Sequence, residues 1–268
     1  MQLENAVALI TGAGSGIGRA LAVQAAARGM RLVLVGRRAE PLAHTRALAA
    51  AAACDVFAGD ITSAPDRERL ARHLAAGPGH VGLLVNNAGV VHAGALESCS
   101  DEDLQRMVAT NVVAPMALTR VLLPLLRKAP GARVLNVGSM FGDIAFPHFA
   151  AYSATKFALR GFSDALRREL TRHGIGVTYA APRAVRTPAA QGFAHLAGPM
   201  KMRLDAPEDV ARAMLDAVAR DARSVYPRGP ERVFVLLQRL LPAVIDRHLC
   251  RIATAIVEAQ EQVEAGTG

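Results

Sequence analysis

Tyr152 and Lys156 are four residues apart, and Ser139 lies thirteen positions before Tyr152. If residues 151–173 form a helix, this spacing places the phenol and the ammonium one turn apart on the same face. A free phenol ionises near pH 10, and a fixed cation beside it lowers that pKa. Such a tyrosine can act as a general acid or base, so the three residues predict a proton-transfer site. The pair alone is more often a half-buried tyrosine beside a solvated lysine.

The N-terminal segment predicts a nucleotide-binding turn. Residues 6–10 form an apolar run of strand length, and a glycine-rich segment over 11–18 leads into an Ala- and Leu-rich helix. In this arrangement backbone N–H groups and a helix N-terminus hold a pyrophosphate, and a Cβ would block its approach. The glycines are Gly12, Gly16 and Gly18 rather than G-x-G-x-x-G. A flexible turn without a ligand is the alternative.

The end of the second expected strand, residues 31–35, indicates which cofactor is preferred. A carboxylate at this place would bond the ribose 2′-hydroxyl of NAD, but the chain has Gly36 followed by Arg37 and Arg38. Guanidinium groups suit a phosphate, so the sequence favours NADP(H) over NAD(H). Two solvated surface arginines are the alternative.

Taken in order along the chain, these motifs resemble those of the short-chain dehydrogenase/reductase family. The resemblance covers the chain from Val7 to about Tyr226. Each motif is weak alone, and the ordered set is specific. The set comprises the glycine-rich turn, Asp60-Ile61, Asn86-Asn87-Ala88-Gly89, Asn111, Ser139, Tyr152 and Lys156.

The resemblance implies a role for each member of the catalytic set. Tyr152 would give its proton to a substrate carbonyl oxygen as hydride reaches the carbonyl carbon, or would do the reverse in oxidation. Lys156 would bond the nicotinamide ribose and lower the tyrosine pKa, and Ser139 would hydrogen-bond the substrate oxygen. Asn111, in a helical stretch from about 101 to 128, would hold a water near Lys156 through its backbone.

The resemblance also implies a set of residues around the cofactor. Asp60 and Ile61 would contact the adenine ring, and the turn over 86–89 would support the ribose and the nicotinamide. Val185 and Thr187 would contact the carboxamide and the diphosphate. The full expected set is Thr11, Gly12, Ser15, Gly16, Ile17, Gly18, Arg37, Arg38, Asp60, Ile61, Asn87, Ala88, Gly89, Tyr152, Lys156, Pro182, Val185 and Thr187.

Arg183 departs from the family pattern, which has glycine after the proline at this place. Glycine permits backbone conformations that arginine resists. We therefore expect either a shifted turn or a strained Arg183 beside the nicotinamide.

Composition and periodicity predict an α/β fold of the Rossmann type. With 268 residues, 51% of them hydrophobic, the chain can bury one sizeable core. Apolar strands alternating with Ala-rich helical segments predict a doubly wound parallel sheet with helices on both faces. We expect an NADP(H)-binding catalytic domain over 1–230 and a helical C-terminal extension over 231–268. The strands are expected near 6–10, 31–35, 54–58, 81–85, 132–138, 175–181 and 223–227.

Other features limit the class of protein. Cys54, Cys99 and Cys250 share no metal-ligand spacing, so we expect reduced thiols and no metal site. The first strand begins almost at the N-terminus and leaves no room for a signal peptide, which makes a cytoplasmic setting the expectation. The chain lacks a run of about 18 uncharged apolar residues, so we expect no transmembrane span. The net charge of +8 comes from arginines without a recognition motif, so we expect no nucleic-acid partner.

Two apolar segments are expected to contact the substrate. Residues 140–149 join Ser139 to Tyr152, and residues 188–204 follow Thr187. Loops of this kind set specificity on a rigid scaffold, and closure excludes water. We expect a hydrophobic carbonyl or alcohol as substrate, or else simple packing of the local core. The candidate lid side chains are Phe193, Leu196, Met200 and Met202, and His148 and His195 are candidate pocket groups.

Two amphipathic helices are expected at residues 231–241 and 242–263. Their apolar stripe must be buried, with the domain itself as the first expectation, a second subunit next and a membrane surface third. We expect a homodimer or homotetramer, because the helices near 101–128 and 151–173 pair between subunits in the family.

The sequence therefore predicts an NADP(H)-dependent oxidoreductase that interconverts a carbonyl and a secondary alcohol. A non-catalytic NADP(H)-binding sensor or scaffold is the alternative, and Arg183 is the feature that favours it. A different reaction on the same fold is a third reading.

Overall fold

The fold is built on one parallel sheet. The computed structural model describes residues 3–51 and 53–266, so residues 1–2, 52 and 267–268 of the two predicted domain ranges lie outside the described part. The strands run in the order β3-β2-β1-β4-β5-β6-β7, and each overlaps the segment that the sequence predicts. They are β1 (Val7–Thr11), β2 (Arg31–Gly36), β3 (Cys54–Ala58), β4 (Leu83–Asn86), β5 (Arg133–Val137), β6 (Gly176–Ala180) and β7 (Ser224–Val225).

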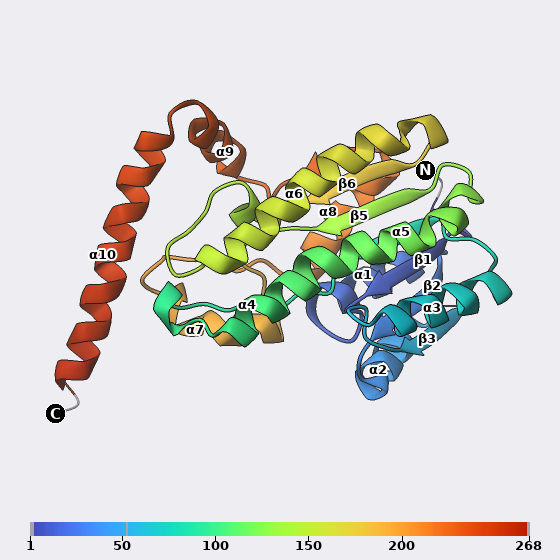
Figure 1. Cartoon of the computed structure of the whole chain (residues 1–268), viewed down its shortest axis with the longest axis horizontal. Coiled ribbons are helices and arrows are strands. Elements are labelled where there is room, and N and C mark those ends of the chain that lie inside the picture. Colours follow the sequence, from blue (N-terminus) through green and yellow to red (C-terminus); the bar gives the residue numbers. More distant parts are fainter. Residues whose placement is uncertain (1–2, 52, 267–268) are drawn as a thin grey trace.

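Helices cover both faces of this sheet (Figure 1). On one face α1, α2 and α8 pack through Leu21, Leu42 and Met214, and on the other α3, α5 and α6 pack through their own apolar side chains. The predicted doubly wound Rossmann-type fold is confirmed. The helices are α1 (Gly16–Ala26), α2 (Ala39–Ala49), α3 (Ala64–Ala76), α4 (Asp101–Val108), α5 (Ala114–Arg127), α6 (Ala150–Leu170), α7 (Ala194–Ala197), α8 (Pro207–Ala219), α9 (Glu231–Leu240) and α10 (Pro242–Gly266).

Local signals fix where several of these helices begin. The Ser63 side chain accepts a hydrogen bond from the Asp66 N–H at the start of α3, and Ser100 does the same for Asp103 at the start of α4. Helix α8 starts at Pro207, a residue that suits the first turn of a helix. These caps hold the connections between strands and helices in place.

The order of the strands places the site. Strand β1 lies between β2 and β4. The chain adds β2 and β3 on one side of β1 and then adds β4 to β7 on the other side. In open parallel sheets ligands bind at such a switch point, beyond the carboxyl ends of the strands. Here those ends carry Thr11, Gly36, Asn86 and Val137.

The predicted helix near 101–128 is three segments in succession. A π-helical turn over Ala109–Val113 separates α4 from α5, and it contains Asn111. Single π turns inside α-helices are frequent at functional sites. Within the described residues, Asp101–Arg127 is the one helical run that is long and apolar enough to cross a membrane, with 44% of its apolar window buried inside the fold. It packs on the sheet through Leu118, Leu122 and Leu126, as a core helix does.

The predicted helices of the C-terminal extension form as α9 and α10, and Figure 1 shows α10 along one end of the molecule. Val235, Ile245 and Leu249 pack in one cluster with Met140, Ile144 and Tyr179, so the domain covers part of the apolar stripe. The expected stripe is only partly covered, however. Val233, Phe234, Leu240 and Leu241 remain exposed.

Candidate active site

One cavity of about 700 Å³ lies beyond the carboxyl ends of the strands. The glycine-rich turn after β1, the ends of β2 and β4, and the start of α6 all contribute to its wall. Its position is the switch point of the sheet, and its size is within the range of cofactor and substrate pockets.

The glycine-rich turn places backbone without side chains at the wall of the cavity. A Cβ at Gly12, where φ is +64°, would lie 2.9 Å from the Ala88 Cα, and one at Gly18 would overlap the Gly12 carbonyl. Ser15 precedes α1 and makes no side-chain cap, and the first turn of α1 contains no acidic residue. The leading N–H groups of α1 are therefore left for an anion, as a pyrophosphate site requires.

Thr11 and Asn87 join this turn to the turn after β4. The Thr11 hydroxyl donates to the Val85 carbonyl at 3.0 Å and accepts from the N–H groups of Asn87 and Ala88 at 3.0 and 3.1 Å. The Asn87 side chain donates to the Thr11 carbonyl at 2.9 Å. These bonds hold Ala88 and Gly89 at the wall of the cavity.

The end of β2 presents positive charge. Gly36, Arg37 and Arg38 line the cavity, and no carboxylate stands among them. Asp60 also lines it, but its carboxylate accepts from the Thr62 N–H and hydroxyl at 2.9 and 2.8 Å. The charge at this corner therefore suits a phosphate better than a bare ribose.

Ser139, Tyr152 and Lys156 meet on the opposite side of the same cavity. Ser139 follows β5, while α6 carries Tyr152 and Lys156 on successive turns, as their spacing predicts. Ser139 and Tyr152 both line the cavity, and the Ser139 hydroxyl accepts from the Phe141 N–H at 3.1 Å. The Lys156 Nζ lies 5.5 Å from the centre of the Tyr152 ring and donates to the Val137 carbonyl at 3.1 Å. The arrangement can deliver a proton to an oxygen held beside the phenol.

The pKa of Tyr152 is shifted against the sequence-based expectation. Burial raises the pKa of this phenol to about 12, and the hydrogen bond to Ser139 opposes that rise without overcoming it. Burial also lowers the pKa of Lys156 to about 8. The expectation of a tyrosine pKa depressed by lysine is wrong for this arrangement, because loss of solvent around the phenol dominates. Tyr152 is therefore protonated at neutral pH, the form that a general acid needs.

Asn111 acts on this site through its side chain. Its amide accepts from the Val90 N–H at 2.9 Å, donates to the Val90 carbonyl at 2.8 Å, and donates to the Thr155 hydroxyl at 3.1 Å. Thr155 precedes Lys156, so Asn111 connects the turn after β4 to α6. Its expected hold on a water through the backbone remains a prediction.

Arg183 is not strained. It is absent from the positive-φ residues, and its guanidinium pairs with Asp205 at 2.8 Å and with Glu231 at the start of α9. The expectation of a strained Arg183 backbone is wrong, because its φ is not positive and its side chain pairs with Asp205 and Glu231. Arg183 connects the loop after β6 to the C-terminal extension.

Apolar side chains line the rest of the cavity. Phe193, Met200 and Met202 of the predicted lid lie there, together with Phe146 and Phe149 from the connection before Tyr152. Leu196 is buried behind them, and neither His148 nor His195 reaches the cavity wall. Such a lining suits an apolar substrate.

Comparison with known proteins decides the family. The model of the short chain dehydrogenase family matches residues 6–195. The chain belongs to this family. The resemblance drawn from the ordered motifs is thereby confirmed, and members of the family are oxidoreductases that use a nicotinamide cofactor.

Individual short-chain dehydrogenases resemble the chain over most of its length. It is 33% identical to dehydrogenase/reductase SDR family member 7B of Bos taurus, over 91% of this chain and 80% of that protein. The structure of a short-chain dehydrogenase from Streptomyces avermitilis has 30% identity and a TM-score of 0.78, covering 99% of this chain and all of that one. The RhlG/NADP active-site complex of Pseudomonas aeruginosa also has 30% identity and a TM-score of 0.78, over 85% and 96% of the two chains.

The short-chain dehydrogenase fold gathers nearly all the residues expected from the sequence around one cavity. Among the expected catalytic and cofactor-binding residues, Thr11 and Asn111 are the two that do not line it, since both bind the turns that do. Sequence reasoning missed Glu231 and Phe234, which reach the cavity wall from α9. Their place depends on the pairing with Arg183, for which a single sequence holds no signal. Among the described residues, no group of three or more His, Cys, Asp or Glu could hold a metal ion.

Proposed function

We propose that the chain is an NADP(H)-dependent oxidoreductase that interconverts a carbonyl and a secondary alcohol on a hydrophobic small molecule. The observation that carries the proposal is the position of the Tyr152 phenol. It lines the same cavity as Ser139 and the glycine-rich turn, and the Lys156 ammonium lies 5.5 Å from the centre of its ring.

The donor groups around the cavity fit NADP(H). The bare turn between Gly12 and Gly18 and the uncapped start of α1 suit the pyrophosphate. Arg37 and Arg38 suit a 2′-phosphate, because a guanidinium binds phosphate through charge-assisted hydrogen bonds. The absence of a carboxylate after β2 supports the preference over NAD(H).

The residues of the chain then perform the proton chemistry. When bound, a nicotinamide supplies or accepts the hydride. Ser139 holds the substrate oxygen and stabilises the charge that develops on it. Tyr152 gives its proton to that oxygen in reduction and takes it back in oxidation. Lys156 stabilises the phenolate left behind, since its positive charge lies above the tyrosine ring.

The lining of the cavity sets the substrate class. Phe146, Phe149, Phe193, Met200 and Met202 offer contact area to an apolar molecule, and methionine side chains adapt to varied shapes. The proposal is therefore a hydrophobic ketone or secondary alcohol.

The contacts of Arg183 support the enzyme over the sensor alternative. The sensor alternative depended on Arg183 disturbing the nicotinamide end, and Arg183 instead pairs with Asp205 and Glu231.

An assembly of two or four copies through α4–α5 and α6 is also proposed, supported by the exposed Val108, Val113 and Phe157 on those helices. Light scattering coupled to gel filtration, with Phe157→Lys as the disrupting variant, tests it.

The test is a titration of the purified protein with NADPH and NADH, followed by NADPH consumption with a panel of apolar ketones. We expect NADPH to bind about tenfold or more tightly than NADH. Turnover should fall by about 10²–10⁴-fold in Tyr152→Phe, which removes the acid and keeps the ring. Binding without turnover on any ketone would favour a sensor, and the absence of nucleotide binding would refute the proposal.

A further inference from the structure

A buried tyrosine that the proposed chemistry does not use lies directly behind Ser139. Tyr179, on β6, is 1% exposed. Its hydroxyl donates to the Ser139 carbonyl at 3.0 Å and accepts from the Ser139 N–H at 3.3 Å. One side chain thus binds both backbone groups of the serine that faces the substrate oxygen.

The backbone around Ser139 leaves room for this phenol. A Cβ at Gly138 would overlap the ring and hydroxyl of Tyr179, and a Cβ at Gly142 would overlap the same hydroxyl. Neither glycine has a positive φ, so the backbone conformation does not require glycine at these positions. The close approach of the Tyr179 side chain does. The loop after β5 is shaped around Tyr179.

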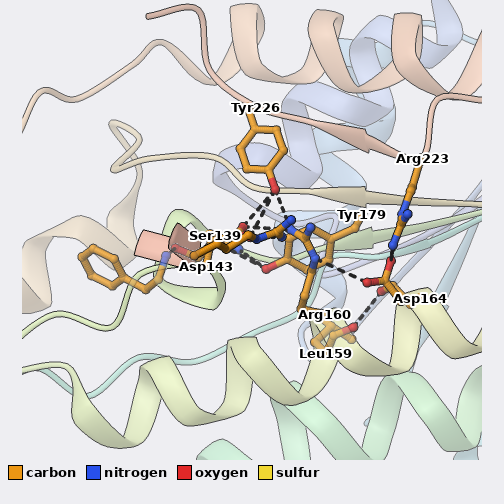
Figure 2. A network of polar contacts seen from close by, with 11 residues as sticks. Ser139, Asp143, Leu159, Arg160, Asp164, Tyr179, Arg223 and Tyr226 are labelled. Atoms are coloured by element: carbon orange, nitrogen blue, oxygen red, sulfur yellow. Dashed lines mark hydrogen bonds and ion pairs between the residues drawn. The ribbon is translucent and has the colours of Figure 1, made fainter. Parts of the chain in front are cut away.

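A charged network fixes the tyrosine ring from the other side (Figure 2). The Arg160 guanidinium lies 4.8 Å from the ring centre of Tyr179 and donates to the two Asp143 oxygens at 2.8 and 2.9 Å. The Tyr226 hydroxyl contacts Arg160 at 2.6 Å and Asp143 at 3.2 Å. The Asp143 side chain is 2% exposed, and Arg239 of α9 also pairs with it at 3.4 Å. A buried charge this well paired holds its partners in one arrangement.

Tyr179 itself cannot be the acid. Its hydroxyl is engaged by the backbone of Ser139, and it does not line the cavity. Its effect on the reaction therefore passes through the position of the serine. A displacement of about 1 Å at a reacting centre costs on the order of a hundredfold in rate.

We propose that Tyr179 is a positioning residue for Ser139, and that Asp143, Arg160 and Tyr226 hold Tyr179 in place. The role in catalysis rests on the proposed function, whereas the structural hold does not. Through Arg239 the network also extends to α9, so the C-terminal extension supports the site from behind.

The test uses Tyr179→Phe, which removes only the hydroxyl. We expect kcat for ketone reduction to fall by about 10–100-fold while the KM for NADPH stays within about twofold. The matched control is Thr178→Val on the same strand, which also removes a buried hydroxyl, bonded at 2.8 Å to the Ala222 carbonyl and not to Ser139. Its kcat should stay within about threefold of the parent.

A double-mutant cycle separates positioning from general loss of structure. If Tyr179 acts through Ser139, adding Tyr179→Phe to Ser139→Ala should lower kcat no further than Ser139→Ala alone. Multiplication of the two single losses in the double variant would overturn the proposal.

Hydrogen exchange provides a readout that needs no turnover. In Tyr179→Phe the amide of Ser139 loses its acceptor, so the segment over 139–142 should exchange faster than in the parent or in Thr178→Val. Unchanged exchange would refute the hold on Ser139. A parent protein without ketone turnover would refute the proposed function instead, and the exchange result would still decide whether Tyr179 holds the serine.

Discussion

The cofactor half and the substrate half of the cavity are built in different ways. Around Gly12 and Gly18 the wall is backbone, fixed by bonds between turns that follow adjacent strands. Around Phe193 and Met202 the wall is apolar side chains, held by elements far apart in the chain. A wall of backbone suits a ligand of one fixed shape, whereas a wall of side chains can change its specificity without changing the fold. The difference predicts separable effects of substitutions.

The largest effect is expected from Gly18→Ala. Its Cβ would overlap the Gly12 carbonyl, a backbone group that cannot move aside. We expect NADPH binding to weaken by more than about a hundredfold, measured by fluorescence titration. The control is Gly161→Ala in α6, where a Cβ meets nothing within 4 Å, and which should leave binding intact. Equal binding by the two variants would contradict a backbone-built cofactor half.

A smaller loss is expected when Arg37 and Arg38 are both replaced by alanine. A charge-assisted hydrogen bond to a phosphate is worth about 1.5–3 kcal/mol, so with one such bond lost the NADPH affinity should fall about 10–100-fold. NADH affinity should change little, and the ratio of the two dissociation constants is the measurement. Arg72→Ala, an exposed arginine on α3, serves as the control. An unchanged ratio would mean that these arginines face solvent.

Phe234→Ala tests the substrate half. Phe234 lines the cavity from α9 although 46% of it is exposed. Its removal should change the KM for bulky ketones by about 3–10-fold, since lost apolar contact is worth about 1 kcal/mol, and should leave NADPH binding unchanged. Leu48→Ala is the matched control, because Leu48 is 50% exposed and lies outside the cavity. The comparison fails if both variants shift the KM equally.

Arg183→Gly should affect stability more than cofactor binding. The variant leaves the mostly buried Asp205 and Glu231 carboxylates without their cation, at a cost of about 1–3 kcal/mol. The Tm should fall by about 2–8 °C in thermal unfolding, while the dissociation constant for NADPH stays within about threefold. Combining it with Glu231→Gln should restore part of the Tm. A large loss of NADPH affinity would instead place Arg183 in the cofactor half.

The last prediction concerns the dependence of stability on pH. Burial lowers the pKa of Lys156 to about 8 from its ordinary 10.5, so between these values the unfolded chain binds more protons than the folded one. The contribution of Lys156 to stability therefore rises with pH across this window and is least favourable below pH 8. The Tm of the parent relative to Lys156→Met should increase from pH 8 to pH 10. A flat difference would mean that Lys156 keeps its ordinary pKa.

Almost all the residues that the sequence places around the cofactor line the cavity. The turn after β1 and the arginines after β2 depend on residues next to each other, so local patterns identify them. The ends of the strands then follow from apolar runs, because parallel strands bring their carboxyl ends to one edge.

The substrate half of the cavity and the residues that support it were harder to predict from the sequence. The pairing of Arg183 with Glu231 and the position of Phe234 depend on how α9 docks, which spacing along the chain does not encode. The same holds for Tyr179, whose partner Ser139 lies 40 residues away on a neighbouring element. The pKa of Tyr152 was misjudged because it depends on burial, a property of the assembled fold.

The packing of α10 against the lid has a consequence for the order in which the protein matures during synthesis. Ile256 of α10 contacts the cluster that contains Phe149, Leu196 and Met200. Translation delivers the N-terminal strands first, so the cofactor half can assemble while residues 231–256 are still inside the ribosome. A nascent chain at that stage would lack Phe234 of the cavity wall and the packing of Ile256 on this cluster. The substrate half of the cavity is therefore completed last, when α9 and α10 emerge and dock.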